Sequence, residues 1–256
     1  MLADRVVIVT GSTTGIGRAI AAQCIAEGAR VVVHGRDERR GRDLVAPWGD
    51  RAVFHADDLS DPASAGRLVR CAVDAFGGLD GIVNNAAWVV RSNLEADDRL
   101  LDQVIAVNVR APLLLIKAAL PYLEARRGCV INIGSVNALG GEQNLLHYSI
   151  SKGALLTLSR NLANALAPRQ VRLYHFNVGW VLTENEYHYK VADGLPDNWP
   201  ETLDEVDIPS GRMTTPEQAA AAICLWLSDR VRPFSGTVME LEQFPFEGRN
   251  PTRKAR

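Results

Sequence analysis

The chain has 256 residues, of which 47% are hydrophobic and 23% charged, and its formal net charge is −2. This length and composition supply enough apolar material for the core of a large globular domain. The small net charge argues against a general electrostatic attraction to nucleic acid or to an anionic membrane.

Cysteine usage and the N-terminal segment narrow the class further. Cys24, Cys71, Cys129 and Cys224 are scattered and include no Cys-x-x-Cys pair, so we predict no metal site and no disulfide framework. The first ten residues read as a charged turn and a strand, without a basic segment followed by an apolar leader. No stretch reads as long and apolar enough to cross a membrane, so we expect a cytoplasmic protein with no membrane partner.

Apolar β-branched runs alternate with helical patterns along the chain. The predicted strands are 5–10, 30–34, 52–56, 81–84, 129–134, 171–177 and 237–241. The predicted helices are 16–27, 62–76, 98–120 with a bend at Pro112, 148–167, and 216–228. This alternation predicts an α/β fold of the doubly wound Rossmann type, in which helices cover both faces of a mainly parallel seven-stranded sheet. We expect a single domain over residues 1–256, with ligands at the carboxyl ends of the strands.

One long irregular segment, 183–212, interrupts the alternation. It is rich in Glu, Asp, Pro, Tyr and Trp. A long insertion in a compact domain is usually a binding loop or a disordered stretch. Tyr187, Tyr189, Leu195 and Trp199 give it apolar material to pack, so we predict a substrate lid.

A glycine cluster joins the first predicted strand to the first predicted helix. Gly11, Gly15 and Gly17 allow a tight turn and a close approach of the backbone to a pyrophosphate. The helix that follows offers free N–H groups and a partial positive charge. The cluster therefore predicts a dinucleotide site.

A tyrosine and a lysine four residues apart suggest acid–base chemistry. Tyr148 and Lys152 share one helix face. A phenol ordinarily ionises near pH 10. A positive charge about 4 Å away, at an effective dielectric constant of about 20, would lower that pKa by on the order of three units. Such a tyrosine could exchange a proton near neutral pH.

Together with Asn84-Asn85-Ala86-Ala87 and Ser135, the glycine spacing and the Tyr-x3-Lys pair resemble the classical short-chain dehydrogenase/reductase family. The resemblance runs from about residue 5 to 183 and resumes near 211–236. It implies that Tyr148 transfers a proton to or from the substrate oxygen while Lys152 lowers the pKa of Tyr148 and binds the nicotinamide ribose. It also implies that Ser135 orients the carbonyl and that Asn108 helps to hold a water molecule for proton relay. The hydride comes from the cofactor.

The same resemblance implies a set of cofactor-binding residues. They are Gly11, Thr13, Gly15, Ile16, Gly17, Arg36, Asp58, Leu59, Asn84, Ala86, Tyr148, Lys152, Gly179, Val181 and Thr183. Three of them have an alternative reading: Arg36 as a solvated loop residue, Asp58 as a turn acid, and Thr183 as a helix cap.

The end of the second predicted strand bears on the choice of cofactor. Gly35 stands where NAD users of the family carry an acid, and Arg36 suits a bidentate contact with phosphate. We therefore predict NADP(H), with NAD(H) as the alternative. Against NADP(H), Thr14 stands where many NADP users have a second basic residue. Asp37 reads as a helix N-cap.

Three positions depart from the family pattern. Ala87 replaces a glycine, Val178 replaces the proline of Asn-Pro-Gly, and 240–243 replaces a Val-Asp-Gly-Gly ending. The apolar tail 244–246 reads equally well as packing on a neighbouring subunit or on its own core. The family commonly forms tetramers or dimers, so we expect a homo-oligomer.

We predict an NAD(P)-dependent oxidoreductase that interconverts a secondary alcohol and a carbonyl. Polar and aromatic residues near the tyrosine favour a sugar-like or polyol-like substrate; these are Gln143, Asn144, His147, Trp180, Glu184, Glu186, Tyr187 and His188. His147 and His188 read as loop residues without a catalytic role. The alternatives are a non-catalytic nicotinamide-binding sensor or scaffold, and an epimerase or dehydratase that uses the cofactor as a transient hydride store.

Overall fold

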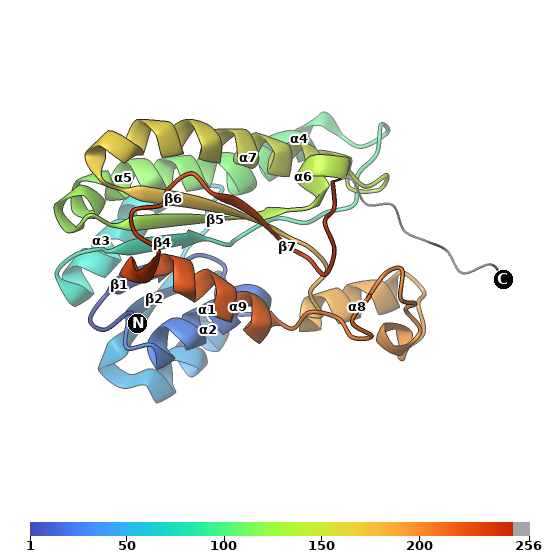
Figure 1. Cartoon of the computed structure of the whole chain (residues 1–256), viewed down its shortest axis with the longest axis horizontal. Coiled ribbons are helices and arrows are strands. Elements are labelled where there is room, and N and C mark those ends of the chain that lie inside the picture. Colours follow the sequence, from blue (N-terminus) through green and yellow to red (C-terminus); the bar gives the residue numbers. More distant parts are fainter. Residues whose placement is uncertain (248–256) are drawn as a thin grey trace.

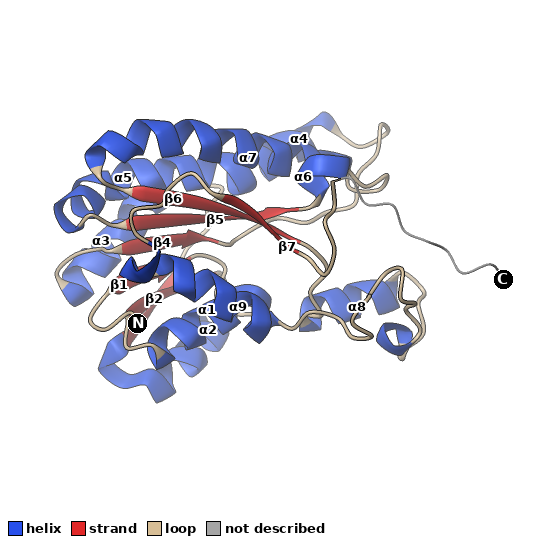
Figure 2. Ribbon diagram, viewed as in Figure 1, coloured by secondary structure: helices blue, strands red, loops and turns tan. Residues whose placement is uncertain are grey.

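The computed structural model describes residues 1–247. A seven-stranded sheet, every strand parallel to its neighbours, forms the centre of the molecule (Figures 1 and 2), with the strand order β3-β2-β1-β4-β5-β6-β7. The strands are β1 (Val6–Val9), β2 (Arg30–Gly35), β3 (Ala52–Ala56), β4 (Gly81–Asn84), β5 (Cys129–Ser135), β6 (Arg172–Val178) and β7 (Val238–Leu241). The predicted fold class is confirmed.

Helices cover both faces of the sheet (Figure 1). The longer ones are α1 (Gly15–Ala26), α2 (Glu38–Val45), α3 (Ser64–Phe76), α4 (Asp98–Ile105), α5 (Ala111–Arg126), α7 (Leu146–Leu166), α8 (Glu184–Ala192) and α9 (Pro216–Leu227). The short ones are η1 (Ala46–Arg51), the π-helical η2 (Ala106–Arg110), α6 (Asn137–Gly140), η3 (Ala167–Arg169), η4 (Trp199–Glu201) and η5 (Asp229–Val231).

Strand side chains alternate between two hydrophobic clusters because successive residues of a strand point to opposite faces. Val7 and Val9 pack with α1 and α9, whereas Val6 and Ile8 pack with α3, α5 and α7. Both faces of β1 are therefore buried, as expected of a strand in a parallel sheet covered on both sides.

The long helical stretch Asp98–Arg126 corrects two expectations. It continues beyond residue 120, and its irregularity is the π-helical η2 that immediately precedes Pro112. Its mean hydropathy of 1.6 also makes it long and apolar enough to cross a membrane, contrary to prediction. The most apolar window is 44% buried, and Leu115, Ala119 and Leu123 pack on the sheet, so core packing accounts for its apolar character.

The lid segment, residues 183–212, is ordered around a small hydrophobic cluster of its own. Trp199 is fully buried there together with Ile208 and Met213. Its ring stacks on Trp180 with the centroids 5.5 Å apart. This segment, which includes α8, projects beyond the carboxyl ends of the strands (Figure 1).

Candidate active site

A cleft of about 1040 Å³ runs along the carboxyl edge of the sheet and is closed on one side by α8. The cleft brings together most of the predicted site residues: Gly11, Thr13, Gly15, Ile16, Gly17, Arg36, Asp58, Leu59, Ala86, Ser135, Tyr148, Lys152, Gly179 and Thr183. Three predicted residues do not line it, namely Asn84, Asn108 and Val181.

The glycine loop after β1 packs against the loop after β4 without room for side chains. Gly11 has φ +60°, and a Cβ there would lie 2.8 Å from the Cα of Ala86. A Cβ on Gly17 would lie 2.3 Å from the carbonyl oxygen of Gly11. The amide of Asn85 holds this contact by donating to the carbonyl oxygens of Thr10 (2.9 Å) and Gly11 (3.1 Å).

The N-terminus of α1 opens onto this loop with its first N–H groups uncapped. Its N-cap residue, Thr14, makes no side-chain capping hydrogen bond, and the first turn contains no acidic residue. Uncapped N–H groups and the positive end of the helix dipole favour an anion. The residues present therefore fit the diphosphate of a dinucleotide.

His34, at the end of β2, was missed by the sequence prediction. Its Nδ1 accepts from the backbone N–H of Gly11 (3.2 Å), so the ring proton sits on Nε2 and is donated to the carbonyl oxygen of Asp57 (3.2 Å). Burial lowers the pKa of His34 to about 4, which keeps the ring neutral. The signal in the sequence was a histidine closing an apolar run, where a buried polar side chain needs partners.

Beyond His34 lies the position that bears on cofactor choice. A Cβ at Gly35 would lie 2.6 Å from Cγ2 of Thr13, so a side chain there would displace the side chain of Thr13. Arg36 lines the cleft, is exposed, and forms no ion pair with any residue in the described range 1–247. Asp37 is the N-cap of α2, as predicted, and accepts from the backbone N–H of Arg40 (2.9 Å).

The loop after β3 presents Asp58 and Leu59 to the cleft. The carboxylate of Asp58 also accepts from the backbone N–H of Ser60 (2.8 Å), so it organises its own turn, as the alternative reading expects. Its neighbour Asp57 is held by Arg67 through two bonds of 2.7 and 2.8 Å, which lower the pKa of Asp57 to about 2.

Ser135, Tyr148 and Lys152 meet at the middle of the cleft. Ser135 ends β5, and the other two stand one turn apart near the start of α7. The Nζ atom of Lys152 lies 5.5 Å from the centroid of the Tyr148 ring and donates to the carbonyl oxygen of Ile133 (2.7 Å). The predicted grouping of these three side chains is therefore present.

The predicted acidic phenol is not found in the protein alone. Burial raises the pKa of Tyr148 to about 12; a hydrogen bond from Ser135 opposes this, and the carboxylates Glu186 and Glu142 add to it. Burial also lowers the pKa of Lys152 to about 8. The sequence argument counted the attraction of the ammonium group but not the desolvation of either partner.

Asn108 lies in η2, 1% exposed, and clasps the backbone of Trp88. Its Oδ1 accepts from the N–H of Trp88 (2.7 Å), while its Nδ2 donates to the carbonyl oxygen of Trp88 (3.1 Å) and to Oγ of Ser151 (3.0 Å). The side chain thus fixes the loop after β4. Pro112 has no N–H, so it cannot donate to the Asn108 carbonyl four residues earlier.

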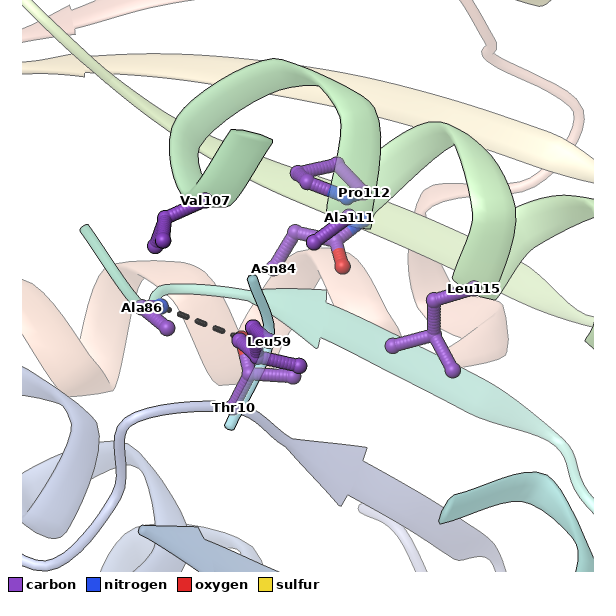
Figure 3. Close-up of a pocket in the computed structure, with 8 residues that line it drawn as sticks. All are labelled: Thr10, Leu59, Asn84, Ala86, Val107, Ala111, Pro112 and Leu115. Carbon is purple, nitrogen blue, oxygen red and sulfur yellow. Dashed lines mark hydrogen bonds between the residues drawn. The ribbon is translucent and has the colours of Figure 1, made fainter. Parts of the chain in front are cut away.

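Asn84 faces a small pocket under the helix η2–α5, and not the cleft (Figure 3). The pocket is lined by Thr10, Leu59, Asn84, Ala86, Val107, Ala111, Pro112 and Leu115. Asn84 donates to Oδ1 of Asn132 (2.8 Å) and is 3% exposed. Val181 packs in the core beside α1 and forms a bridge with Thr214. Neither residue lines the cleft.

Thr183 is the N-cap of α8 as well as a cleft residue, because its Oγ1 accepts from the N–H of Glu186 (3.0 Å). Of the predicted substrate residues, only Glu186 and His188 line the cleft. His147 lies in the first turn of α7, is 7% exposed, and is not the predicted loop residue. The sequence prediction missed Trp88, Val89, Gln103, Asn185, Tyr189 and Ala192.

The residues after β6 and β7 that depart from the family pattern support the rear wall of the cleft. Strand β6 continues through Val178, which pairs in register with Ser135. The carboxylate of Glu242 accepts from the N–H of Trp180 (2.8 Å) and leaves no room for a Cβ at Gly179.

The C-terminal segment also anchors the lid and packs on its own chain. Gln243 accepts from the N–H of Ser210 (3.0 Å) and donates to the carbonyl oxygen of Arg212 (2.7 Å). The ring of Phe246 lies against Gly140. The tail at 244–246 thus makes contact within the subunit.

Residues 5–191 match the family model described as short chain dehydrogenase. The chain is 32% identical over 246 residues to L-rhamnose 1-dehydrogenase (NAD(P)(+)) of Azotobacter vinelandii, an alignment that covers 92% of this chain and 94% of that protein. Among solved structures, L-sorbose reductase from Gluconobacter frateurii, complexed with NADPH and L-sorbose, superposes with a TM-score of 0.87 at 26% identity, covering 93% and 95% of the two chains. The 3-ketoacyl-(acyl-carrier-protein) reductase from Brucella melitensis, complexed with NADH, gives 0.83 at 26% identity and covers 94% and 98%.

Proposed function

Because the chain belongs to the short-chain dehydrogenase/reductase family, we propose that it is an NADP(H)-dependent oxidoreductase that interconverts a secondary alcohol and a carbonyl on a sugar-like or polyol-like substrate. The observation that carries this proposal is the meeting of Ser135, Tyr148 and Lys152 in the same cleft as the uncapped N-terminus of α1. A proton carrier and a dinucleotide site are what such a reaction requires.

Each group has a role that follows from its position. The bound nicotinamide supplies or accepts the hydride. Ser135 and Tyr148 hydrogen-bond the substrate oxygen, and Tyr148 carries its proton. Lys152, held at the carbonyl oxygen of Ile133, places a positive charge beside the phenol and would donate to the ribose of a bound cofactor.

The state of the cofactor bears on the phenol. An oxidised nicotinamide ring is positively charged, and a positive charge near Tyr148 favours the phenolate. We therefore expect the pKa of Tyr148 to fall from about 12 when oxidised cofactor binds. Asn108, through its backbone carbonyl, holds the water molecule that returns the proton to solvent.

The catalytic proposal is tested with Tyr148→Phe. This variant keeps the ring but has no proton to transfer, so we expect turnover to fall by at least about 10³-fold. Binding of NADPH, followed by the change in its fluorescence, should weaken only a few-fold. Turnover near the wild-type rate would overturn the role of Tyr148.

The preference for NADP(H) is supported by the guanidinium of Arg36 at the cleft, which forms no ion pair within residues 1–247, and by Gly35, which brings no acidic charge that would repel a phosphate. Arg36→Ala should weaken NADPH by about 10- to 100-fold and NADH by much less, because only NADPH carries the 2′-phosphate. Arg39→Ala is the matched control, since Arg39 is exposed but does not line the cleft. Tighter binding of NADH than of NADPH by the wild-type protein would contradict the proposed preference for NADP(H).

A further inference from the structure

Trp88, to which the sequence prediction gave no role, and Glu186, which it placed among the substrate residues, define the substrate end of the cleft. Trp88, from the loop after β4, and Glu186, from α8, both line it. They come from different elements that line the same cleft as Tyr148, so a substrate bound at the phenol can contact both. The chemical groups that Trp88 and Glu186 can bind therefore determine which alcohol the site accepts.

Trp88 presents an apolar ring on a backbone that is held in place. Its side chain is 38% exposed, which is unusual for so large an apolar residue. Its backbone N–H and C=O are both held by the buried amide of Asn108. An exposed ring on a backbone held at both ends is a preorganised surface for the C–H face of a ligand.

Glu186 presents one free carboxylate oxygen. Its Oε1 accepts from Nε1 of Trp180 (2.8 Å) and lies 3.8 Å from Nζ of Lys190. Trp180 in turn stacks on the fully buried Trp199, so the carboxylate is held on a packed support. No hydrogen bond or ion pair engages Oε2 within residues 1–247.

The charges around this end of the cleft disfavour an anionic group. Lys152 is engaged with Ile133, Lys190 with Glu186, and Arg91 with Asp193. A carboxylate or phosphate on the substrate has only acceptor oxygens, so it could not donate a hydrogen bond to Oε2 of Glu186. A cationic group is disfavoured as well, because Lys190 already stands beside the carboxylate.

We propose that Glu186 is the specificity-determining residue of this site. Its Oε2 accepts a hydrogen bond from a second hydroxyl of an uncharged polyol or sugar whose carbon skeleton lies on the ring of Trp88. This inference rests on the proposed oxidoreductase function and names its substrate class.

The test uses three compounds that differ only at one terminal carbon, with 2-butanol as an alcohol that lacks a second hydroxyl. D-sorbitol is neutral, D-gluconate carries a carboxylate there, and glucamine carries an ammonium group. We expect wild-type kcat/KM for sorbitol to exceed that for gluconate and for glucamine by at least about tenfold. A preference for either charged compound would overturn the proposal.

Glu186→Gln then separates a specificity role from a structural one. This variant keeps an acceptor for Trp180 but loses the charge. We expect kcat/KM for sorbitol to fall by about tenfold more than that for 2-butanol, and the sorbitol-to-gluconate ratio to shrink by about tenfold, because hydrogen bonds to a charged group are the stronger ones. Glu184→Gln, at an exposed position of α8 outside the cleft, should leave both ratios within about twofold of wild type.

The outcomes distinguish the two proposals. If wild-type protein oxidises no alcohol with either cofactor, the proposed function fails. If it oxidises 2-butanol but not sorbitol, or if Glu186→Gln leaves the sorbitol-to-gluconate ratio unchanged, the function stands and the role of Glu186 is wrong.

Discussion

Lys152 shows how one buried position sets two properties at once. Its ammonium group, 2% exposed, is anchored by the carbonyl oxygen of Ile133 at 2.7 Å. Burial removes the water that would stabilise the charge, and the pKa of the amine therefore falls to about 8. The residue that stabilises a phenolate is thus itself poised to lose its charge in mildly alkaline solution.

A pH profile tests this consequence. Lys152 is charged below its lowered pKa and neutral above it, so kcat/KM for carbonyl reduction should be level below pH 8 and fall about tenfold per unit above it. Lys152→Arg keeps its charge to a far higher pH, so whatever activity it retains should lack this alkaline decline. A wild-type profile that stays level to about pH 10 would contradict the assignment.

At the scale of elements, the strands were predictable and several helices were not. Buried parallel strands are continuous apolar runs, so the sequence predicts all seven strands. The eight residues of α2 are mostly charged, and α8 is rich in polar and aromatic residues, so neither shows an apolar period. Their positions depend on capping by Asp37 and Thr183 and on packing that only the folded chain provides.

Some residues of the site were likewise predictable from the sequence and others were not. Residues that belong to a spaced motif, such as Tyr148 and Lys152, are found in the cleft. Asn84 ends β4 and Val181 follows β6, and the ends of both strands approach the cleft, but the two side chains point into the interior. The directions of single side chains at a strand end, like the burial that raises the pKa of Tyr148, depend on tertiary packing.

The lid segment makes its own prediction. Trp199 fills the small cluster that supports α8, so Trp199→Ala leaves a cavity there and should loosen residues 183–212. We expect faster amide hydrogen exchange in α8 and a KM raised by about tenfold, with exchange in α7 unchanged. Leu195→Ala is the control, because Leu195 lies in the same segment but is 36% exposed. Equal acceleration in α7 would mean that the lid and the sheet unfold together.

Across the whole molecule, buried polar groups tie the strands together beneath the site. Asn132, Ser159 and His175 form a chain of hydrogen bonds of 2.8 Å between β5, α7 and β6. His34 ties the ends of β1, β2 and β3 together on the other side. Desolvation lowers the pKa of both histidines to about 4, so both are neutral in the fold.

This neutrality predicts an acid-sensitive stability. The unfolded chain protonates these histidines near pH 6.5, whereas the folded chain resists protonation down to about pH 4. The unfolding free energy should therefore be level above pH 6.5 and fall between pH 6.5 and 4, by up to about 3 kcal/mol for each histidine. Urea unfolding at about pH 7, 6 and 5 measures it.

His175→Gln should reduce this slope by roughly half, because only His34 of the pair remains. A stability that stays constant or rises on acidification would show that these rings are protonated in the native protein.

The separate hydrophobic cluster around Trp199 has an evolutionary consequence. Substitutions in residues 183–212, the proposed substrate lid, disturb only this small cluster, while the sheet and the cleft after β1 depend on other side chains. Substitutions in these thirty residues can therefore change which alcohol the protein binds without first requiring a gain in the stability of the whole fold.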